Sequence, residues 1–147
     1  MYKRILVATD GSDLSAKAVE SAIALASSLK AELFAVKVVH RYAHSYFEGS
    51  RPSAMSETAR IEADWAAAAQ KVIDGVVAAA KLRDVAAHGL VVHSDQVSEA
   101  VIAAATKHEC DLIVMASHGR RGVSRLLLGS ETQHVLTHSH IPVLVLR

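Results

Sequence analysis

Apolar positions along the chain follow two alternating patterns, one typical of buried strands and one typical of helices. Short apolar runs predict five strands, at residues 4–9, 33–39, 90–93, 111–116 and 141–146. Apolar residues recurring every three or four positions predict four helices, over residues 13–29, 53–82, 95–108 and from 130 onward. Because each strand is joined to the next through a helix, we expect a single α/β domain over residues 1–147. Its sheet should be doubly wound, five-stranded and mostly parallel, with helices on both faces.

The ends of these elements carry residues that favour turns and helix caps. The Asp-Gly-Ser sequence at 10–12 follows the first strand and predicts a turn and a cap on the next helix. Asp95 is expected to cap the third helix. Ser130 is expected to cap the fourth, with Gln133 completing a capping box. Residues 41–52, polar and aromatic with one glycine and one proline, predict a loop.

The long second helix is expected to place one apolar face in the core. The residues of that face are Ile61, Trp65, Ala68, Val72 and Val76.

A sheet of this kind also predicts where function lies. Ligands of doubly wound folds bind outside the carboxyl ends of the strands, where the winding direction reverses. If the first strand is central, this crevice lies between the ends of the first and fourth strands. Residues 9–11 stand at one end and residues 116–119 at the other. Asp10 has two interpretations, a turn residue or a ligand contact, and the crevice favours the contact.

Composition narrows the class of protein. Hydrophobic residues make up 51% of the 147 residues, which favours a packed globule over disorder. The net charge of +1 gives no argument for nucleic acid or an anionic membrane surface. One cysteine, Cys110, and an apolar run of only four residues near the N-terminus, 5–8, favour a cytoplasmic protein. We expect Cys110 to be a packed thiol and not a nucleophile.

The segment 116–130 carries most of the chemical information. Gly119, Gly122 and Gly129 lie on one strand-to-helix connection, where glycine lets the backbone approach a ligand closely. A helix that begins at 129–130 would point free N–H groups and its positive dipole end into the crevice, which suits an anion. Three arginines in this segment, at 120, 121 and 125, add positive charge. On chemistry alone, a tight turn with solvated arginines explains the segment equally well.

Two common phosphate motifs are absent from the sequence. No Gly-x4-Gly-Lys-Ser/Thr occurs, so a P-loop lysine is missing. No Gly-x-Gly-x-x-Gly follows the first strand, which argues against a dinucleotide site.

The glycine segment resembles the ATP-binding loop of the universal stress protein family, Gly-x2-Gly-x9-Gly-Ser/Thr, through Gly119, Gly129 and Ser130. The resemblance extends over the whole chain, from residues 3–12 through 111–119 and 126–130 to 141–145. It implies a Rossmann-like sheet in the order 3-2-1-4-5 and a site for ATP or AMP in the crevice. It also implies a role in stress response. Mg²⁺ with the phosphates is left open by the sequence.

Carried over by position, the resemblance implies that Asp10 contacts the nucleoside and that the Val38 backbone contacts adenine. Met115 and Ala116 would line the site, while Gly119, Gly129, Ser130 and Thr132 would hold phosphates. With their neighbours, the expected nucleotide-binding residues are Ala8, Thr9, Asp10, Val38, Met115, Ala116, His118, Gly119, Arg120, Gly129, Ser130, Glu131 and Thr132.

Ala116 departs from the family pattern, which has glycine there. A position that requires positive φ would be strained by alanine by about 1–2 kcal/mol, whereas ordinary strand geometry would cost little.

We therefore keep three hypotheses: a nucleotide-binding regulatory module, a dimeric interaction protein without nucleotide, and a slow ATPase. We expect no catalytic residues and at most weak hydrolysis.

The remaining features have less weight. His134 and His138 are four residues apart, with His140 close behind, but no carboxylate or thiolate completes a metal site, so polar helix-end residues are the preferred interpretation. The apolar segment 141–146 is expected to form an edge strand. The family resemblance implies a homodimer through that strand.

Overall fold

In a computed structural model of the chain, five parallel strands form one sheet in the order β3-β2-β1-β4-β5. The strands are β1 (Arg4–Ala8), β2 (Glu32–Val39), β3 (Ala87–His93), β4 (Leu112–Ala116) and β5 (Val143–Leu146). The helices are α1 (Asp13–Leu29), α2 (Pro52–Lys81), α3 (Val97–Lys107) and α4 (Ser130–His138). The structure describes residues 1–41, 52–119 and 127–147, with only the backbone of residues 52–56. The expected fold class and strand order are confirmed.

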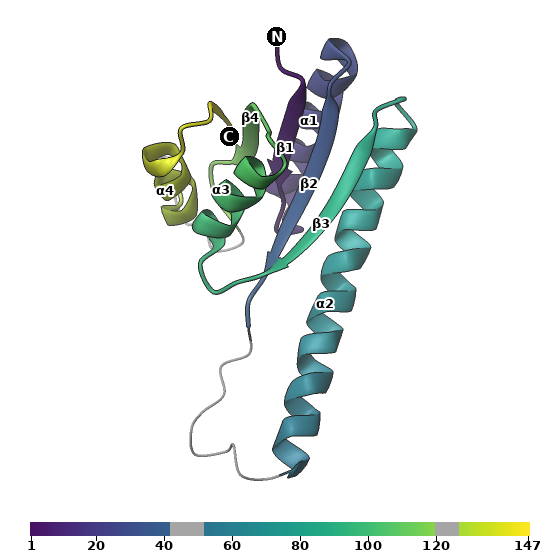
Figure 1. The fold of residues 1–147 in the computed structure, drawn as a ribbon, viewed down its shortest axis with the longest axis vertical. Helices are drawn as coiled ribbons and strands as arrows, with labels where there is room; N and C mark the ends of the chain where they lie inside the picture. The colour runs from purple at the N-terminus through teal and green to yellow at the C-terminus, as the bar shows by residue number, and fades with distance from the viewer. Residues whose placement is uncertain (42–51, 120–126) are drawn as a thin grey trace.

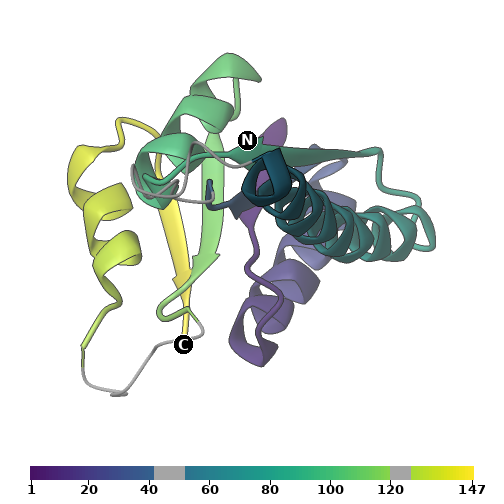
Figure 2. The ribbon, with the colours of Figure 1, turned by 90° about the horizontal axis from the view of Figure 1, so that it is seen from below.

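Helices cover the sheet from both sides, as Figures 1 and 2 show. One core lies beneath α1 and α2 and includes Ile23 and Ile73. The other lies beneath α3 and α4 and includes Val101 and Val135. β1 is central because it pairs with β2 on one side and β4 on the other. The winding direction therefore reverses between β1 and β4, where the sequence predicted a crevice.

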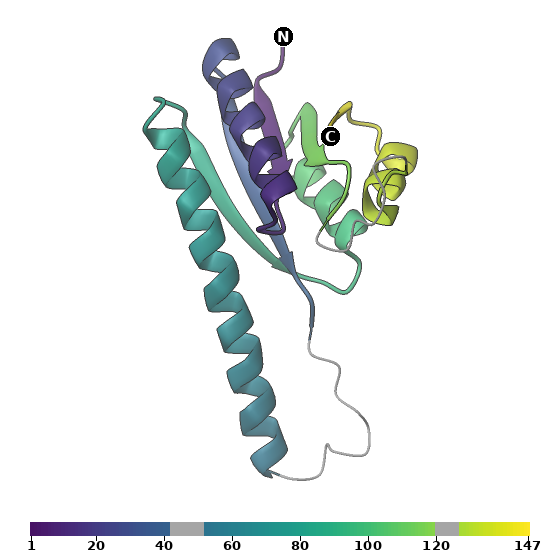
Figure 3. The ribbon, with the colours of Figure 1, turned by 180° about the vertical axis from the view of Figure 1, so that it is seen from behind.

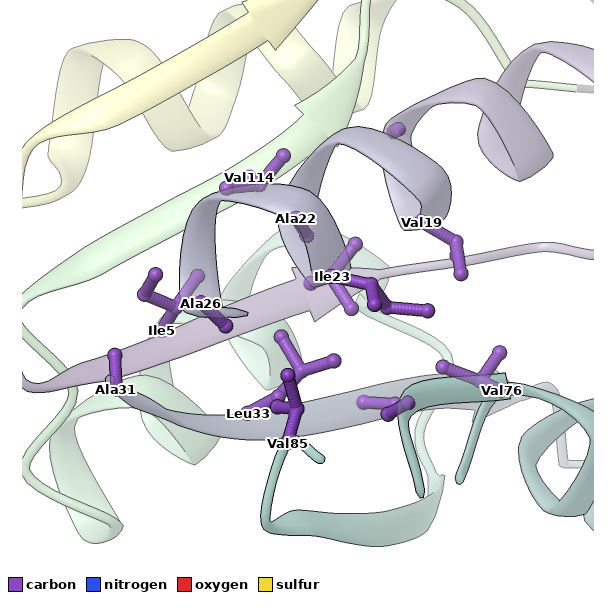
Figure 4. Packing of buried hydrophobic residues seen from close by; sticks show 14 of the residues in the cluster. Ile5, Val19, Ala22, Ile23, Ala26, Ala31, Leu33, Val76, Val85 and Val114 are labelled. Atoms are coloured by element: carbon purple, nitrogen blue, oxygen red, sulfur yellow. The ribbon is translucent and has the colours of Figure 1, made fainter. Parts of the chain in front are cut away.

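Helix α1 shows how sequence and packing agree. The Ser12 hydroxyl accepts the Ser15 N–H at 3.2 Å and caps the helix, as expected. Ala22, Ile23 and Ala26 then pack on the sheet, where Figure 4 shows them against Ile5, Leu33 and Val114. Burying such side chains contributes roughly 1.5–3 kcal/mol each for the larger ones. The start of α1 is thus held firmly beside the crevice.

The core face of α2 differs from the prediction. The buried positions include Ala69, Ile73, Val76 and Ala80, whereas Trp65 is 41% exposed. Ala68 is also exposed, and Ile61 and Val72 are only half-buried. The helix is rich in alanine, so it offers several faces that are apolar enough to bury. Its first half extends past the carboxyl ends of the strands (Figures 1 and 3), so this part of the helix has no sheet beneath it.

Two other element boundaries also need correction. β3 begins at Ala87 and not at Leu90, since Leu33 and Phe34 of β2 pair with Ala87 and His88. Asp95 does not cap α3: Gln96 precedes the helix, without a side-chain bond to it. The Asp95 carboxylate instead accepts the Arg41 N–H at 3.0 Å. That contact ties the chain after β2 to the turn after β3.

The remaining differences at element ends are small. Pro52, which was expected to belong to a loop, is the first residue of α2. β5 begins at Val143, after Pro142, whose carbonyl accepts the Ile113 N–H at 2.9 Å.

Cys110 is buried, 5% exposed, directly before β4. Burial raises the pKa of its thiol to about 11, and the neighbouring Asp111 carboxylate adds to the rise. A protonated, buried thiol is a poor nucleophile, so the expectation of a packed cysteine is confirmed. Among the described residues, none of the helices has the length and apolar character needed to cross a membrane.

Candidate nucleotide site

The turn after β1 forms one wall of the crevice. β1 ends at Ala8, and the Thr9 N–H still donates to the Val36 carbonyl at 3.0 Å. Gly11 has φ 81°, a conformation that favours glycine, and its N–H donates to the Thr9 hydroxyl at 3.2 Å. One oxygen of Asp10, Oδ1, accepts the Ser12 N–H at 2.9 Å. The turn is therefore held by its own side chains in the loop predicted from the sequence.

A lysine reaches the same turn from β2. The Nζ atom of Lys37 donates to the Asp10 carbonyl oxygen at 3.3 Å. Lys37 was not among the residues predicted from the sequence, although a signal was present: it is the only charged residue in the apolar run 33–39. A charged residue within a strand of this kind is unusual unless it has a partner.

The end of β4 forms the opposite wall and fixes the start of α4. The Gly129 N–H donates to the Ser117 carbonyl at 2.7 Å, and the Thr132 hydroxyl donates to the Ala116 carbonyl at 2.8 Å. The Ser117 N–H donates to the Leu146 carbonyl at 2.7 Å, which joins β5 to this point. The Gly129 N–H and the Thr132 hydroxyl are thus engaged within the protein.

Gly119 and Asp10 bring the two walls together. A Cβ atom placed on Gly119 would lie 2.9 Å from Oδ2 of Asp10, which is too close for a real side chain. Gly129 is also confined, because a Cβ there would lie 3.2 Å from the Ser117 carbonyl oxygen. The residues at the ends of β1 and β4 therefore adjoin one another, and a side chain at position 119 would displace the Asp10 carboxylate.

The amino end of α4 differs in detail from the prediction. Gly129 precedes the helix with φ −61° and ψ 151°, and Ser130 is the first helical residue and not the cap. The capping box expected between Ser130 and Gln133 is absent, because the Gln133 N–H bonds the Gly129 carbonyl at 2.9 Å. Within residues 1–41, 52–119 and 127–147, no acceptor reaches the N–H groups of residues 130–132. Three backbone donors at a positive helix end suit an anionic group.

Ala116 lies in ordinary strand geometry. It is the last residue of β4, and positive φ values are confined, among described non-glycine residues, to Lys30, Asp84 and Glu109. Its methyl group belongs to the core beneath α1. The first of the two alternatives for this position, a strained backbone, is therefore excluded.

The end of β2 offers backbone groups to the crevice. The Thr9 N–H bonds Val36 and the Ser94 N–H bonds Val39, so even-numbered residues of β2 face β1 and odd-numbered ones face β3. The N–H and carbonyl of Val38 therefore point to the side of β1, beyond its end, and no partner for them is found in the described part of the chain. Ala8 is half-buried and Met115 is buried close to this position.

Two further predicted residues have partners within the protein. Nδ1 of His118 lies 2.8 Å from the Ser117 hydroxyl, while its buried Nε2 has no hydrogen-bond partner among the described residues. The Glu131 carboxylate accepts the Ser98 N–H at 2.8 Å and so caps α3 from the neighbouring helix. The described residues do not include four predicted positions of the glycine segment, Arg120, Arg121, Gly122 and Arg125, or the aromatic loop 42–47.

Metal ligands do not gather in the described residues, where no group of three or more His, Cys, Asp or Glu side chains is found. His134 and His138 stack with ring centroids 3.9 Å apart, and Nδ1 of His138 lies 3.0 Å from the His134 carbonyl oxygen. These imidazoles thus interact with one another and with the helix backbone.

The chain and its fold resemble those of known proteins. A model of the universal stress protein family matches residues 1–147. The chain belongs to the universal stress protein family. Universal stress protein MJ0531 of Methanocaldococcus jannaschii is 33% identical over 153 residues, covering 100% of this chain and 83% of that protein.

Solved structures of universal stress proteins share the fold. UspA from Lactobacillus plantarum superposes with a TM-score of 0.85 at 25% identity, covering 99% of this chain and 98% of that one. A universal stress protein from Archaeoglobus fulgidus in complex with dAMP gives a TM-score of 0.68 at 15% identity, with coverages of 99% and 98%.

Proposed function

We propose that this universal stress protein binds an adenine nucleotide, ATP or AMP, in the crevice between β1 and β4 and acts as a regulatory module in stress response. The observation that carries the proposal is the meeting of Asp10 with Gly119, beside the N–H groups of residues 130–132, which no acceptor in the described part of the chain reaches. A carboxylate on one wall and anion-binding donors on the other match the two ends of a nucleotide.

The nucleoside end is assigned to β1 and β2. Oδ2 of Asp10 faces Gly119 across the crevice and is the oxygen assigned to the ribose hydroxyls. The N–H and carbonyl of Val38 form a donor–acceptor pair at the end of β2, which complements the edge of adenine. Ala8, Thr9 and Met115 complete the wall around the base.

The phosphate end is assigned to α4. The N–H groups of Ser130, Glu131 and Thr132 supply the donors, and Gly119 and Gly129 leave room for the phosphates. Nε2 of His118, for which the described residues supply no hydrogen-bond partner, is an additional polar atom assigned to this wall. Arg120 is assigned here by sequence alone. Mg²⁺, if bound, is held by the phosphates and not by a set of protein ligands.

The comparisons support the class of ligand only at the level of the fold. The Archaeoglobus fulgidus protein was solved with dAMP, and at 15% identity the likeness extends to the architecture alone. Ala116 supports retention of binding, because its unstrained backbone removes the expected penalty. The proposed activity is binding and regulation in the cytoplasm, with at most weak hydrolysis of ATP.

The test is a calorimetric titration of nucleotide-free protein with ATP and Mg²⁺, and then with AMP and adenosine. Ser130→Pro is the most selective variant, because proline is well tolerated as the first helical residue and removes only one N–H. We expect wild-type protein to bind ATP, and Ser130→Pro to bind ATP about tenfold more weakly with adenosine affinity unchanged.

Ser130→Ala is the matched control, since it removes the hydroxyl and keeps the N–H. A wild-type protein that gives neither heat nor a thermal shift with ATP or AMP would sink the proposal. That result would favour the alternative of a dimeric interaction protein. Equal ATP affinity in Ser130→Pro and wild type would instead place the phosphates elsewhere.

We also propose a homodimer formed through the segment 141–146. β5 pairs with β4 on one side, and its other edge has no strand beside it in the described chain. Leu144 of β5 and Leu136 of α4 are 40% and 42% exposed. An apolar edge strand of this kind favours pairing with a second copy.

A further inference from the structure

Lys37 stands out among the residues of β2. Its neighbours on the same face, Leu33 and Ala35, are fully buried in the core beneath α1 and α2, whereas Lys37 is half-buried at the end of that face. Ordering and desolvating a lysine side chain here opposes folding, so a compensating interaction is expected. One compensating contact in the structure is with the Asp10 carbonyl oxygen, 3.3 Å from Nζ.

The Asp10–Gly11 peptide is held at both of its ends. Its carbonyl oxygen accepts from Lys37, and its N–H donates to the Thr9 hydroxyl at 3.2 Å. The Thr9 hydroxyl lies 3.0 Å from the Ser15 hydroxyl, which donates to the Ser12 carbonyl at 2.9 Å. Lys37 contacts this peptide from outside the β1–α1 segment and joins the turn to β2.

The orientation of this peptide decides where the Asp10 carboxylate lies. Gly11 at φ 81° follows the peptide, and a rotated peptide would change this angle and the path of the chain into α1. In the observed orientation, Oδ1 of Asp10 reaches the Ser12 N–H and Oδ2 faces Gly119. A bond to the carbonyl therefore helps to orient the carboxylate of the same residue.

We propose that Lys37 is a positioning residue of the nucleotide site: it holds the Asp10–Gly11 peptide so that the Asp10 carboxylate faces the crevice. The inference rests on the proposed function for its binding consequence, while its structural part concerns the turn itself. It assigns the lysine to the nucleoside end of the ligand. A lysine that acted only through its charge would instead affect the binding of the phosphates.

The two roles are separated by ligand choice. Adenosine carries no phosphate, so a role in phosphate attraction predicts that Lys37→Met weakens ATP binding and leaves adenosine binding unchanged. The positioning role predicts that both ligands lose about tenfold in affinity, the order expected for losing one charged hydrogen bond. Lys37→Arg retains a donor and should recover most of the loss. Lys71→Met, at an exposed position of α2, is the matched control.

A double-mutant cycle tests whether Lys37 acts through Asp10. Asp10→Ala removes the carboxylate and keeps the backbone carbonyl. In that background, Lys37→Met should have no further effect on adenosine affinity, whereas independent contributions would add. A merely structural role would lower the unfolding temperature without this coupling.

A measurement without ligand completes the test. In Lys37→Met, the Gly11 amide should exchange with solvent about tenfold faster than in wild type, while the Ala16 amide, bonded to the Ser12 carbonyl, serves as the internal reference. Unchanged Gly11 exchange, or unchanged adenosine affinity in a nucleotide-binding wild type, would overturn the inference. If wild type binds neither ligand, the proposed function fails, and Gly11 exchange still decides the role of Lys37.

Discussion

Single glycines in this protein differ sharply in what surrounds them. A Cβ on Gly119 would contact the Asp10 carboxylate, and one on Gly129 would press on the Ser117 carbonyl. Gly75, in the middle of α2, has nothing within 4 Å of such an atom. The glycine pattern of the sequence thus has a specific structural meaning at the crevice and none at Gly75.

Gly119→Ala should weaken adenosine binding roughly tenfold while leaving the protein folded, because the new methyl group displaces Oδ2 of Asp10. Titration calorimetry measures the affinity, and circular dichroism checks the fold. Gly75→Ala is the control: it should leave affinity unchanged and raise the free energy of unfolding by about 0.5–1 kcal/mol. If Gly119→Ala bound adenosine as tightly as wild type, Asp10 would not be a contact of the nucleoside.

The sequence predicted the positions of individual residues where a motif or the sheet topology specified them. Gly119 and Gly129 follow from the loop pattern, and Asp10 follows from the switch point of the sheet. The partners of each side chain were not predictable, because they come from distant elements. Lys37 bonds a turn 27 residues earlier, and the Thr132 hydroxyl is engaged by a carbonyl 16 residues away.

Among the elements, α3 and α4 depend on one another at their amino ends. α3 has no side-chain cap from its own sequence, and the Glu131 carboxylate supplies one by accepting the Ser98 N–H. This bond joins the start of α3 to the helix whose own amino end is assigned to phosphates.

Glu131→Ala should lower the free energy of unfolding by about 1 kcal/mol, the usual contribution of a helix cap. Urea denaturation at neutral pH measures this loss, and Glu131→Gln should recover part of it by restoring an acceptor. Glu20→Ala, at an exposed position of α1, should change stability by less than about 0.5 kcal/mol. An Ala variant as stable as wild type would show that the bond contributes nothing in solution.

Element order was predicted well because apolar periodicity reports burial directly. Element ends and buried faces were predicted less well, because more than one residue could cap each helix and more than one face of a helix could be buried. Ser130 has cap chemistry, yet Gly129 precedes the helix because its N–H bonds the Ser117 carbonyl. In α2, the first half of the helix extends past the sheet, and apolar periodicity does not reveal how long the sheet is relative to the helix.

For the molecule as a whole, the topology leaves two sheet edges at which a second copy could pair. β3 and β5 are the two edge strands, and β5 carries the exposed Leu144. The strand order was implied by family resemblance, and the alternation of elements alone gave only the parallel sheet. Assembly depends on surfaces, for which a sequence pattern gives little evidence beyond an apolar edge.

Leu144→Lys should convert the proposed dimer to a monomer at micromolar concentration, because a charged side chain opposes pairing at an edge strand. Sedimentation velocity measures the change. Leu82→Lys, 88% exposed directly after α2, is the control and should leave the dimer intact. A Leu144→Lys variant that sediments as a dimer would place the interface on another surface.

The buried cysteine has a practical consequence for spectroscopy. Cys110 is the sole thiol of the chain, and burial raises its pKa to about 11, so alkylation of the folded protein at pH 8 should be very slow. A new cysteine at an exposed position, such as Leu82→Cys, would then carry a fluorophore alone, without removal of the native residue. The protein is in this sense already a cysteine-free background for site-specific labelling.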